Sequence, residues 1–258
     1  MRAIWTGAIG FGLVNIPVRI FSASQDSNLD LDMLDKKDHA KIRFKRVNED
    51  SGREVSWENI VKAYDYNGKY VVLEDEDFQK ASPEKSKIIE IIEFVNENEI
   101  ESIFYETPYF LEPQKSGKKA YSLLREALKK SGKVGVGSFV MRTKEALCVL
   151  KPMENVILLQ QIRFAQEIRK INDLDIPGKT SFKAGEMQMA MALIDQLTAK
   201  FDISRYKDTY ADQLMKLIHA KAKGRKLPPS HLRVVHSKSK DLMSQLKESL
   251  QSKRKKAS

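Results

Sequence analysis

Cysteine is almost absent from the sequence, and long apolar runs are absent altogether. The single cysteine, Cys148, lies in the apolar run ALCVL. It indicates a small buried side chain in a reducing compartment, and it excludes an internal disulfide framework. No stretch approaches the roughly eighteen apolar residues that a membrane-spanning helix requires. The apolar N-terminus is interrupted by Asn15, Pro17 and Arg19 and has no small-residue cleavage site, so we expect it to form part of the fold and not a signal peptide.

Motifs of nucleotide, metal and nucleophilic chemistry are missing as well. The glycines at 7, 10 and 12 do not have the G-x-G-x-x-G spacing, and they predict strands that bend or approach other backbone closely. There is no Walker lysine motif and no nucleophile-elbow context. None of the histidines pairs with a cysteine or a second histidine at metal-ligand spacing; they are His39, His219, His231 and His236. The sequence therefore gives no positive case for an enzyme, a cofactor or a bound metal.

Charge is unevenly distributed along the chain, although the total of +10 is moderate. Residues 1–110 carry a net charge of −7, residues 111–200 of +7 and residues 201–258 of +10. An acidic part followed by two basic parts indicates a protein that presents one face to a polyanion. A globular protein with a frayed basic tail would give the same totals.

Hydrophobic patterns predict many short strands in the first 162 residues. Two apolar strands are expected over residues 3–22, a half-buried strand over 42–47 and a hairpin turn at Asn67-Gly68. Further strands are expected over residues 87–95, 134–142, 145–151 and 155–162. This density of short strands is typical of a closed barrel or a sandwich.

Helices are expected within this β region and after it. A helix over residues 117–131 has Ala120, Leu124 and Leu128 on one stripe and ends at Gly132. From about residue 183 the sequence becomes helical, with two amphipathic stripes: Met187, Met191, Ile194 and Leu197, then Tyr210, Leu214, Leu217 and Ile218. Pro228-Pro229 predicts a linker, followed by a short helix over residues 241–250 and a basic tail.

Basic residues form clusters that could contact the phosphates of a nucleic acid. The first cluster comprises Lys36, Lys37, Lys41, Arg43, Lys45 and Arg46; the second comprises Lys115, Lys118 and Lys119; the third comprises Arg142 and Lys144; and the tail contributes Lys253, Arg254, Lys255 and Lys256. Few aromatic residues accompany them, which favours duplex backbone over single strands. Each cluster alone could equally be a solvated surface.

Acidic clusters offer a competing interpretation, a magnesium-dependent nuclease. The candidate ligands are Asp30, Asp32, Asp35 and Asp38, and the run 74–77. The first set lies beside lysines, and the second resembles the start of a helix, where carboxylates are favoured by the dipole. Solvated surface and helix capping are therefore the preferred interpretation of both.

Several blocks of the sequence, in order, resemble bacterial Ku proteins. They are WTGAIGFGLVNIPVRIFSA (5–23), DHAKIRFKRV (38–47), NIVKAYDYNGKYVVLEDEDF (59–78), FVNENEIESIFYETPYFLEP (94–113), KAYSLLREALKKSGKVGVGSFVMRTKEAL (119–147), LIDQLTAKFDISRYKDTY (193–210) and DLMSQLKESL (241–250). Some family members carry cysteines that could bind zinc, but here the corresponding positions hold residues such as Lys41, Asn48 and Asp50, so no metal is inferred.

The resemblance implies a mixed α+β fold, with a Ku-type β-barrel core and a helical C-terminal arm. It divides the chain into a barrel core with DNA-encircling loops (1–180), a helical arm (181–227), and a linker with a short amphipathic helix and a basic tail (228–258). It implies a homodimer that encircles double-stranded DNA ends of any sequence in non-homologous end joining, in the bacterial cytoplasm at the nucleoid. It also implies an ATP-dependent repair DNA ligase as partner.

The short C-terminal helix is the expected contact for that ligase. Its apolar stripe consists of Leu242, Leu246 and Leu250, with Met243 beside it. So short a helix is marginal alone, so the stripe requires a surface to pack on. That surface is either the ligase or this chain's own core. Two other functions also stay open: the metal-dependent nuclease, and a general nucleoid-binding protein that has no preference for ends.

Overall fold

The computed structural model describes residues 1–27, 29–81, 87–141, 144–183, 185–225, 243–247 and 249. The chain divides into two compact units, each of which is described here by itself. The first comprises Met1–Asp26 and Asp30–Lys170, and the second comprises Ser27–Leu29 and Ile171–Ser258.

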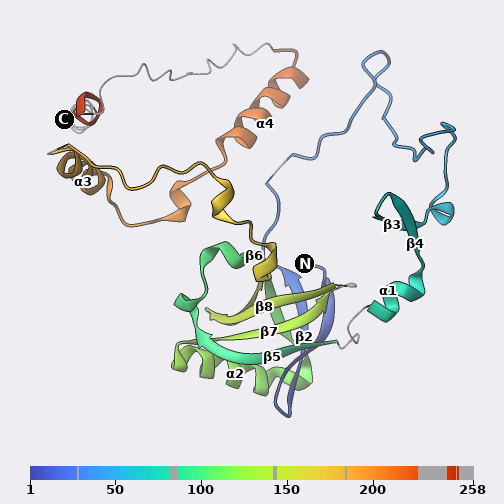
Figure 1. Cartoon of the computed structure of the whole chain (residues 1–258), viewed down its shortest axis with the longest axis horizontal. Coiled ribbons are helices and arrows are strands. Elements are labelled where there is room, and N and C mark those ends of the chain that lie inside the picture. Colours follow the sequence, from blue (N-terminus) through green and yellow to red (C-terminus); the bar gives the residue numbers. More distant parts are fainter. Residues whose placement is uncertain are drawn as a thin grey trace. The chain divides into compact units, whose positions relative to one another are not determined.

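A closed seven-stranded barrel forms the centre of the first unit (Figure 1). Its strands are β1 (Trp5–Phe11), β2 (Val14–Ser22), β5 (Ile88–Asn96), β6 (Tyr105–Pro113), β7 (Lys133–Met141), β8 (Lys144–Met153) and β9 (Val156–Ile162). They pair in the order β1-β2-β6-β9-β8-β7-β5, and β5 returns to β1. The β1–β5 pair is parallel, whereas the other six are antiparallel. The predicted β-barrel core is therefore confirmed.

Strand alternation determines which side chains fill the barrel. On β2, Ile16, Val18 and Ile20 are fully buried, while Arg19 between them is exposed. Helix α2 (Lys118–Ser131) packs against β2, β7 and β8 and adds Tyr121, Leu124 and Leu128 to the same core. It ends at Gly132, which is left-handed as a helix C-terminal glycine usually is.

Two of the N-terminal glycines have the roles that the sequence predicted. A Cβ atom on Gly7 would lie 2.1 Å from the carbonyl oxygen of Lys87, so β5 could not approach β1 with any other residue there. Gly12 has a φ of +56° in the turn between β1 and β2, a conformation that L side chains rarely adopt. Gly7 thus permits the parallel seam, and Gly12 permits the turn that leads into β2.

Between β2 and β5 the chain forms a long excursion with little regular structure. It contains two isolated bridges, the two-stranded sheet of β3 (Lys62–Tyr66) and β4 (Lys69–Leu73), and helix α1 (Asp75–Ala81). The hairpin predicted at Asn67-Gly68 is confirmed, because both residues have positive φ between β3 and β4. The expectation of a half-buried strand over residues 42–47 is wrong. Among the described strands, none pairs with this segment, and Phe44 is 81% exposed.

The second unit carries the helical arm. Its helices are α3 (Glu186–Leu197) and α4 (Thr209–Ala222), and the Asp208 carboxylate caps α4 by accepting from the backbone N–H groups of Tyr210 and Ala211 at 3.0 and 3.1 Å. Residues 243–247 are also helical, and the methyl group of Met243 would lie 4.0 Å from a Cβ on Gly185. Among the described helices, none is both long and apolar enough to cross a membrane.

Short 3-10 turns connect these elements. They are Trp57–Asn59, Glu97–Glu99, Ser102–Phe104, Lys115–Gly117, Ala165–Glu167, Ile171–Asp173 and Ile203–Arg205.

Candidate nucleic-acid interface

The basic cluster over residues 36–46 begins on a tight turn of the excursion. The turn is closed by hydrogen bonds from Asp35 N–H to the Ala40 carbonyl (2.8 Å) and from His39 N–H to the Asp35 carbonyl (2.9 Å). Lys36 and Lys37 lie at its tip, where both are exposed. The cluster therefore presents these cations on a hydrogen-bonded turn and not on a regular strand.

Three members of this cluster already have partners in the chain. Lys41 forms an ion pair with Asp32 at 2.9 Å, Lys45 with Glu54 at 2.6 Å, and the Arg46 guanidinium lies 4.6 Å from the centre of the Trp57 ring. These side chains are largely exposed, and such pairs contribute roughly 0–1 kcal/mol. A phosphate group could therefore replace the carboxylates at little cost.

The other three members have no ion-pair partner among the described residues. Lys36, Lys37 and Arg43 are exposed, and none of them forms a salt bridge or a cation–π contact within the described part of the chain. They are the cations of this cluster that can neutralise phosphates without breaking an existing interaction.

The second cluster lies at the beginning of α2. Lys115 belongs to the preceding 3-10 turn, and Lys118 and Lys119 open the helix; all three are exposed. Gly117 precedes α2 and supplies no capping side chain, so the positive end of the helix dipole adds to the lysine charges. This arrangement favours an anion in front of the helix.

The third cluster is only partly described. Arg142 falls outside the described residues, and Lys144 is exposed at the start of β8, where it pairs with Met141 of β7. A groove of about 400 Å³ places Lys144 together with Glu106, Glu145 and Glu167. Because three carboxylates share this groove with one amine, the surroundings of Lys144 favour phosphate less than those of the other clusters. The tail residues Lys253, Arg254, Lys255 and Lys256 lie outside the described residues.

The predicted partner-binding stripe is also described only in part. Met243 and Leu246 are half-buried in the helical residues 243–247, whereas Leu242 and Leu250 lie outside the described residues. The proximity of Met243 to Gly185 places this short helix beside the start of α3. The same stripe can therefore pack on this chain's own arm.

The acidic side chains act in turns and at a helix start. Asp35 and Asp38 accept hydrogen bonds from the backbone N–H groups of Lys37 and Ala40 at 2.8 and 2.9 Å. Asp77 accepts from the Glu74 N–H at 3.0 Å in the first turn of α1. These contacts support the interpretation of the carboxylates as surface and capping groups. Within the described residues, no three metal-binding side chains gather at one point.

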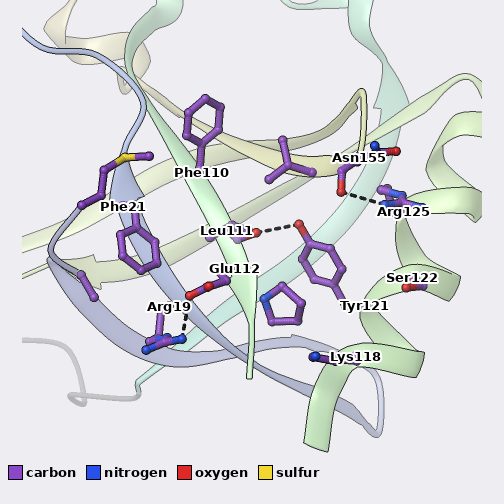
Figure 2. Close-up of a pocket in the computed structure, with 14 residues that line it drawn as sticks. Arg19, Phe21, Phe110, Leu111, Glu112, Lys118, Tyr121, Ser122, Arg125 and Asn155 are labelled. Atoms are coloured by element: carbon purple, nitrogen blue, oxygen red, sulfur yellow. Dashed lines mark hydrogen bonds and ion pairs between the residues drawn. The ribbon is translucent and has the colours of Figure 1, made fainter. Parts of the chain in front are cut away.

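Sequence reasoning missed two further cations, Arg19 and Arg125, which line a groove on the barrel. Arg19 of β2 and Arg125 of α2 lie there with Lys118, around a volume of about 840 Å³ (Figure 2). The only signal in the sequence was the i, i+4, i+7 spacing of Lys118, Ser122 and Arg125 on one helix face. Arg19 gave no such signal, because β2 meets α2 only through the fold.

Among the described residues, the titratable groups with shifted pKa values are Tyr105, Tyr121 and Cys148, in the barrel core and at its edge. Burial raises the pKa of the Tyr121 phenol and of the Cys148 thiol. Both groups therefore stay protonated and neutral at physiological pH, which suits a structural role.

Comparison with known proteins identifies the family. The family model described as the Ku70/Ku80 beta-barrel domain matches residues 10–191. A protein of Coxiella burnetii named "Non-homologous end joining protein Ku" is 37% identical over 262 residues, which covers 98% of this chain and 96% of that protein. Proteins with the same name from Bacillus subtilis and Archaeoglobus fulgidus are 40% and 37% identical, over 86% and 88% of this chain and 72% and 90% of theirs. The chain therefore belongs to the Ku family.

Proposed function

We propose that this chain is a non-enzymatic homodimer that threads onto ends of double-stranded DNA, whatever their sequence, in non-homologous end joining. The observation that carries the proposal is the family match over residues 10–191, together with relatives that bear the name of end-joining proteins over nearly the whole chain. The protein would act in the cytoplasm at the nucleoid, where its DNA is found. No cofactor or metal enters the proposal.

Sequence-independent binding is supported by the kind of basic groups that the chain offers. The clusters at 36–46 and 115–119 consist of flexible lysines and arginines on turns and at a helix start. Such groups are suited to neutralising phosphates, and the sequence contains no zinc-finger motif that would place them against base edges. A ring would supply the missing selectivity, since a closed loop can pass onto a duplex only where the duplex has an end.

A second copy of the chain is supported by apolar surface that the described residues leave uncovered. All but one residue of β3 and β4 is exposed, including Tyr64 at 66% and Tyr70 at 74%. An isolated two-stranded hairpin is marginal in water, so it requires a further surface. The stripe of Met187, Met191 and Ile194 on α3 is also at least half-exposed. A symmetric dimer would cover these surfaces and supply the second half of a ring.

The proposed division of labour follows the three segments expected from the sequence. Residues 1–180 would hold the barrel and the DNA-encircling loops, residues 181–227 the dimer arm, and residues 228–258 the contact with an ATP-dependent repair DNA ligase. Helix-in-groove docking is the mode that a short amphipathic helix allows. Because Met243 lies beside Gly185, ligase docking would compete with this contact inside the chain.

The test is competition between linear duplex and covalently closed circles of the same sequence, at moderate salt. We expect linear DNA to bind and circles to compete poorly. Equal competition per base pair would instead indicate general nucleoid binding. Incubation of labelled linear duplex with the protein and Mg²⁺ or Mn²⁺ separates the nuclease alternative, because an end-binding protein leaves the duplex intact.

A further inference from the structure

A groove of about 840 Å³ runs between α2 and the outer face of strands β2 and β6 (Figure 2). Its floor contains Phe21 and Phe110, which are register partners across these two strands. Their neighbours in sequence, Ile20 and Leu111, are fully buried in the barrel core, so alternation turns both phenylalanines outward. The barrel thus carries a half-buried aromatic pair on its outer surface.

One face of α2 makes the wall of this groove. Lys118, Ser122 and Arg125 follow one another at i, i+4 and i+7, beside the stripe that enters the core. The Arg125 guanidinium is held in place, because Nη1 donates to the Asn155 carbonyl at 2.7 Å and Nη2 pairs with Glu126 at 2.9 Å. The cation is therefore positioned before any ligand arrives.

The opposite side adds a third cation. Arg19 pairs with Glu112 at 2.8 Å, and its guanidinium lies 5.9 Å from the centre of the Phe21 ring. Both members of this ion pair are about half-exposed, so an incoming carboxylate can compete for the arginine. Three cationic side chains and a single carboxylate thus line an aromatic floor.

We propose that this groove binds a short peptide of a partner protein, in which an apolar side chain lies next to two or more carboxylates. The apolar side chain covers Phe21 and Phe110, and the carboxylates meet Arg19 and Arg125. A DNA backbone fits the groove less well, because its sugars and phosphates leave the aromatic floor uncovered. The proposal does not rest on end binding, since it uses only the lining of the groove.

Fluorescently labelled twelve-residue peptides with a central Leu or Phe flanked by Asp and Glu are suitable probes for the full chain. Control peptides replace the acidic residues by Asn and Gln, or the central residue by Ser. The test variant is Ser122→Glu, which places a carboxylate in the wall at a position without a hydrogen bond among the described residues. Its matched control is Leu123→Glu, on the same helix but outside the groove, where Leu123 is 72% exposed.

We expect fluorescence polarisation to show binding only of peptides that carry both features. Ser122→Glu should weaken that binding about tenfold, because the new carboxylate repels those of the peptide and competes with them for Arg125. Leu123→Glu should leave it unchanged, and the two variants, which add the same charge one residue apart on α2, should bind linear duplex with equal affinity. This last measurement separates the groove from the proposed end binding, whose own test is the competition with closed circles.

Three results would overturn the proposal. One is that no acidic peptide binds better than its neutral and serine controls. Another is that Ser122→Glu lowers duplex affinity whereas Leu123→Glu does not, which would make the groove a DNA contact. The third is that a peptide of residues 73–80 of this chain (LEDEDFQK) binds more tightly than every designed peptide, which would assign the groove to a second copy.

Discussion

The hydroxyl group of Tyr121 donates a hydrogen bond to the carbonyl oxygen of Leu111 at 2.6 Å, and thereby ties helix α2 to strand β6. The Tyr121 hydroxyl oxygen in turn accepts a hydrogen bond from the N–H of Ile157 on β9 at 2.7 Å. Leu111 and Ile157 are register partners, so the phenol is inserted into the ladder between two paired strands. The Tyr121 side chain therefore joins helix α2 to two paired strands of the barrel, β6 and β9.

Removing this hydroxyl should destabilise the barrel. Tyr121→Phe leaves a buried carbonyl and a buried N–H without their partner, and we expect a loss of roughly 2 kcal/mol. For a chain of this size the melting temperature should fall by about 4–8 °C. Calorimetry of Tyr121→Phe and Tyr109→Phe provides the comparison, because the Tyr109 hydroxyl has no hydrogen bond among the described residues. Equal melting temperatures for the two variants would refute the bridge.

Charge reversal in the 36–46 cluster should weaken binding of every duplex alike. Lys36→Glu/Lys37→Glu removes two exposed cations that have no ion-pair partner among the described residues. The slope of affinity against salt should flatten by roughly one unit for each phosphate that is no longer neutralised. The matched control is Lys129→Glu/Lys130→Glu, an equally exposed lysine pair at the end of α2. The assignment fails if the two double variants bind alike, or if the effect depends on DNA sequence.

Charges on the exposed stripe of α3 should dissociate the proposed dimer. Met191 and Ile194 are 50% and 56% exposed, so Met191→Glu/Ile194→Glu should not disturb the fold of one copy. It would bury two carboxylates in an apolar interface, which is strongly unfavourable. Light scattering should show a dimer for the parent chain and for Gln196→Glu, a control on α3 outside the stripe, but a monomer for the double variant. A parent chain that is monomeric at micromolar concentration and still binds ends would refute the dimer itself.

Truncations should separate the two C-terminal elements. A chain that ends at Leu250 lacks the four cations at 253–256 and should lose DNA affinity modestly, mainly at low salt, because salt screens the contacts of a charged tail with DNA. A chain that ends at Pro229 should still load onto ends but should no longer stimulate the ligase. Full stimulation by this shorter chain would exclude the docking helix.

Stability should depend on pH through Cys148 at alkaline pH. Burial raises the pKa of this thiol above its ordinary value of 9.0, so the folded state keeps a proton that the unfolded chain loses. The resulting stabilisation is fully present below pH 9.0 and is lost as the pH rises above it, by about 1.4 kcal/mol per unit for one proton. Urea unfolding at several pH values from about 8 to 10 should show this slope for the parent chain and a shallower one for Cys148→Ala. Rapid reaction of the native thiol with a thiol reagent would contradict its burial.

Local signals in the sequence predicted six of the seven barrel strands, all but β6, together with a turn and a helix end outside the barrel, because such signals depend on neighbouring residues. The turn at Asn67-Gly68 and the helix that ends at Gly132 each require a positive φ that these residue types supply. The alternation over residues 42–47 predicted a strand wrongly, since alternation describes a strand only where another strand pairs with it. Phe44 lies on a segment that none of the described strands pairs with.

The groove on the barrel could not be predicted, because its parts come from distant positions. Arg19 and Phe21 meet Phe110 only when β2 pairs with β6, and Arg125 joins them only when α2 packs on the core. Each residue alone looks like an ordinary surface residue. The basic clusters, by contrast, were visible in the sequence as groups of neighbouring lysines and arginines. The sequence did not reveal which of these cations already form ion pairs with carboxylates of the same chain.

The long excursion between β2 and β5 delays closure of the barrel while the chain is being synthesised. β1 and β2 leave the ribosome first and can pair at once, but the partner strand β6 and the seam strand β5 follow only after the long excursion. At about 5–20 residues per second, the remaining strands up to Ile162 take roughly 7–28 s to be synthesised. During that time Ile9, Ile16 and Ile20 have no core to enter.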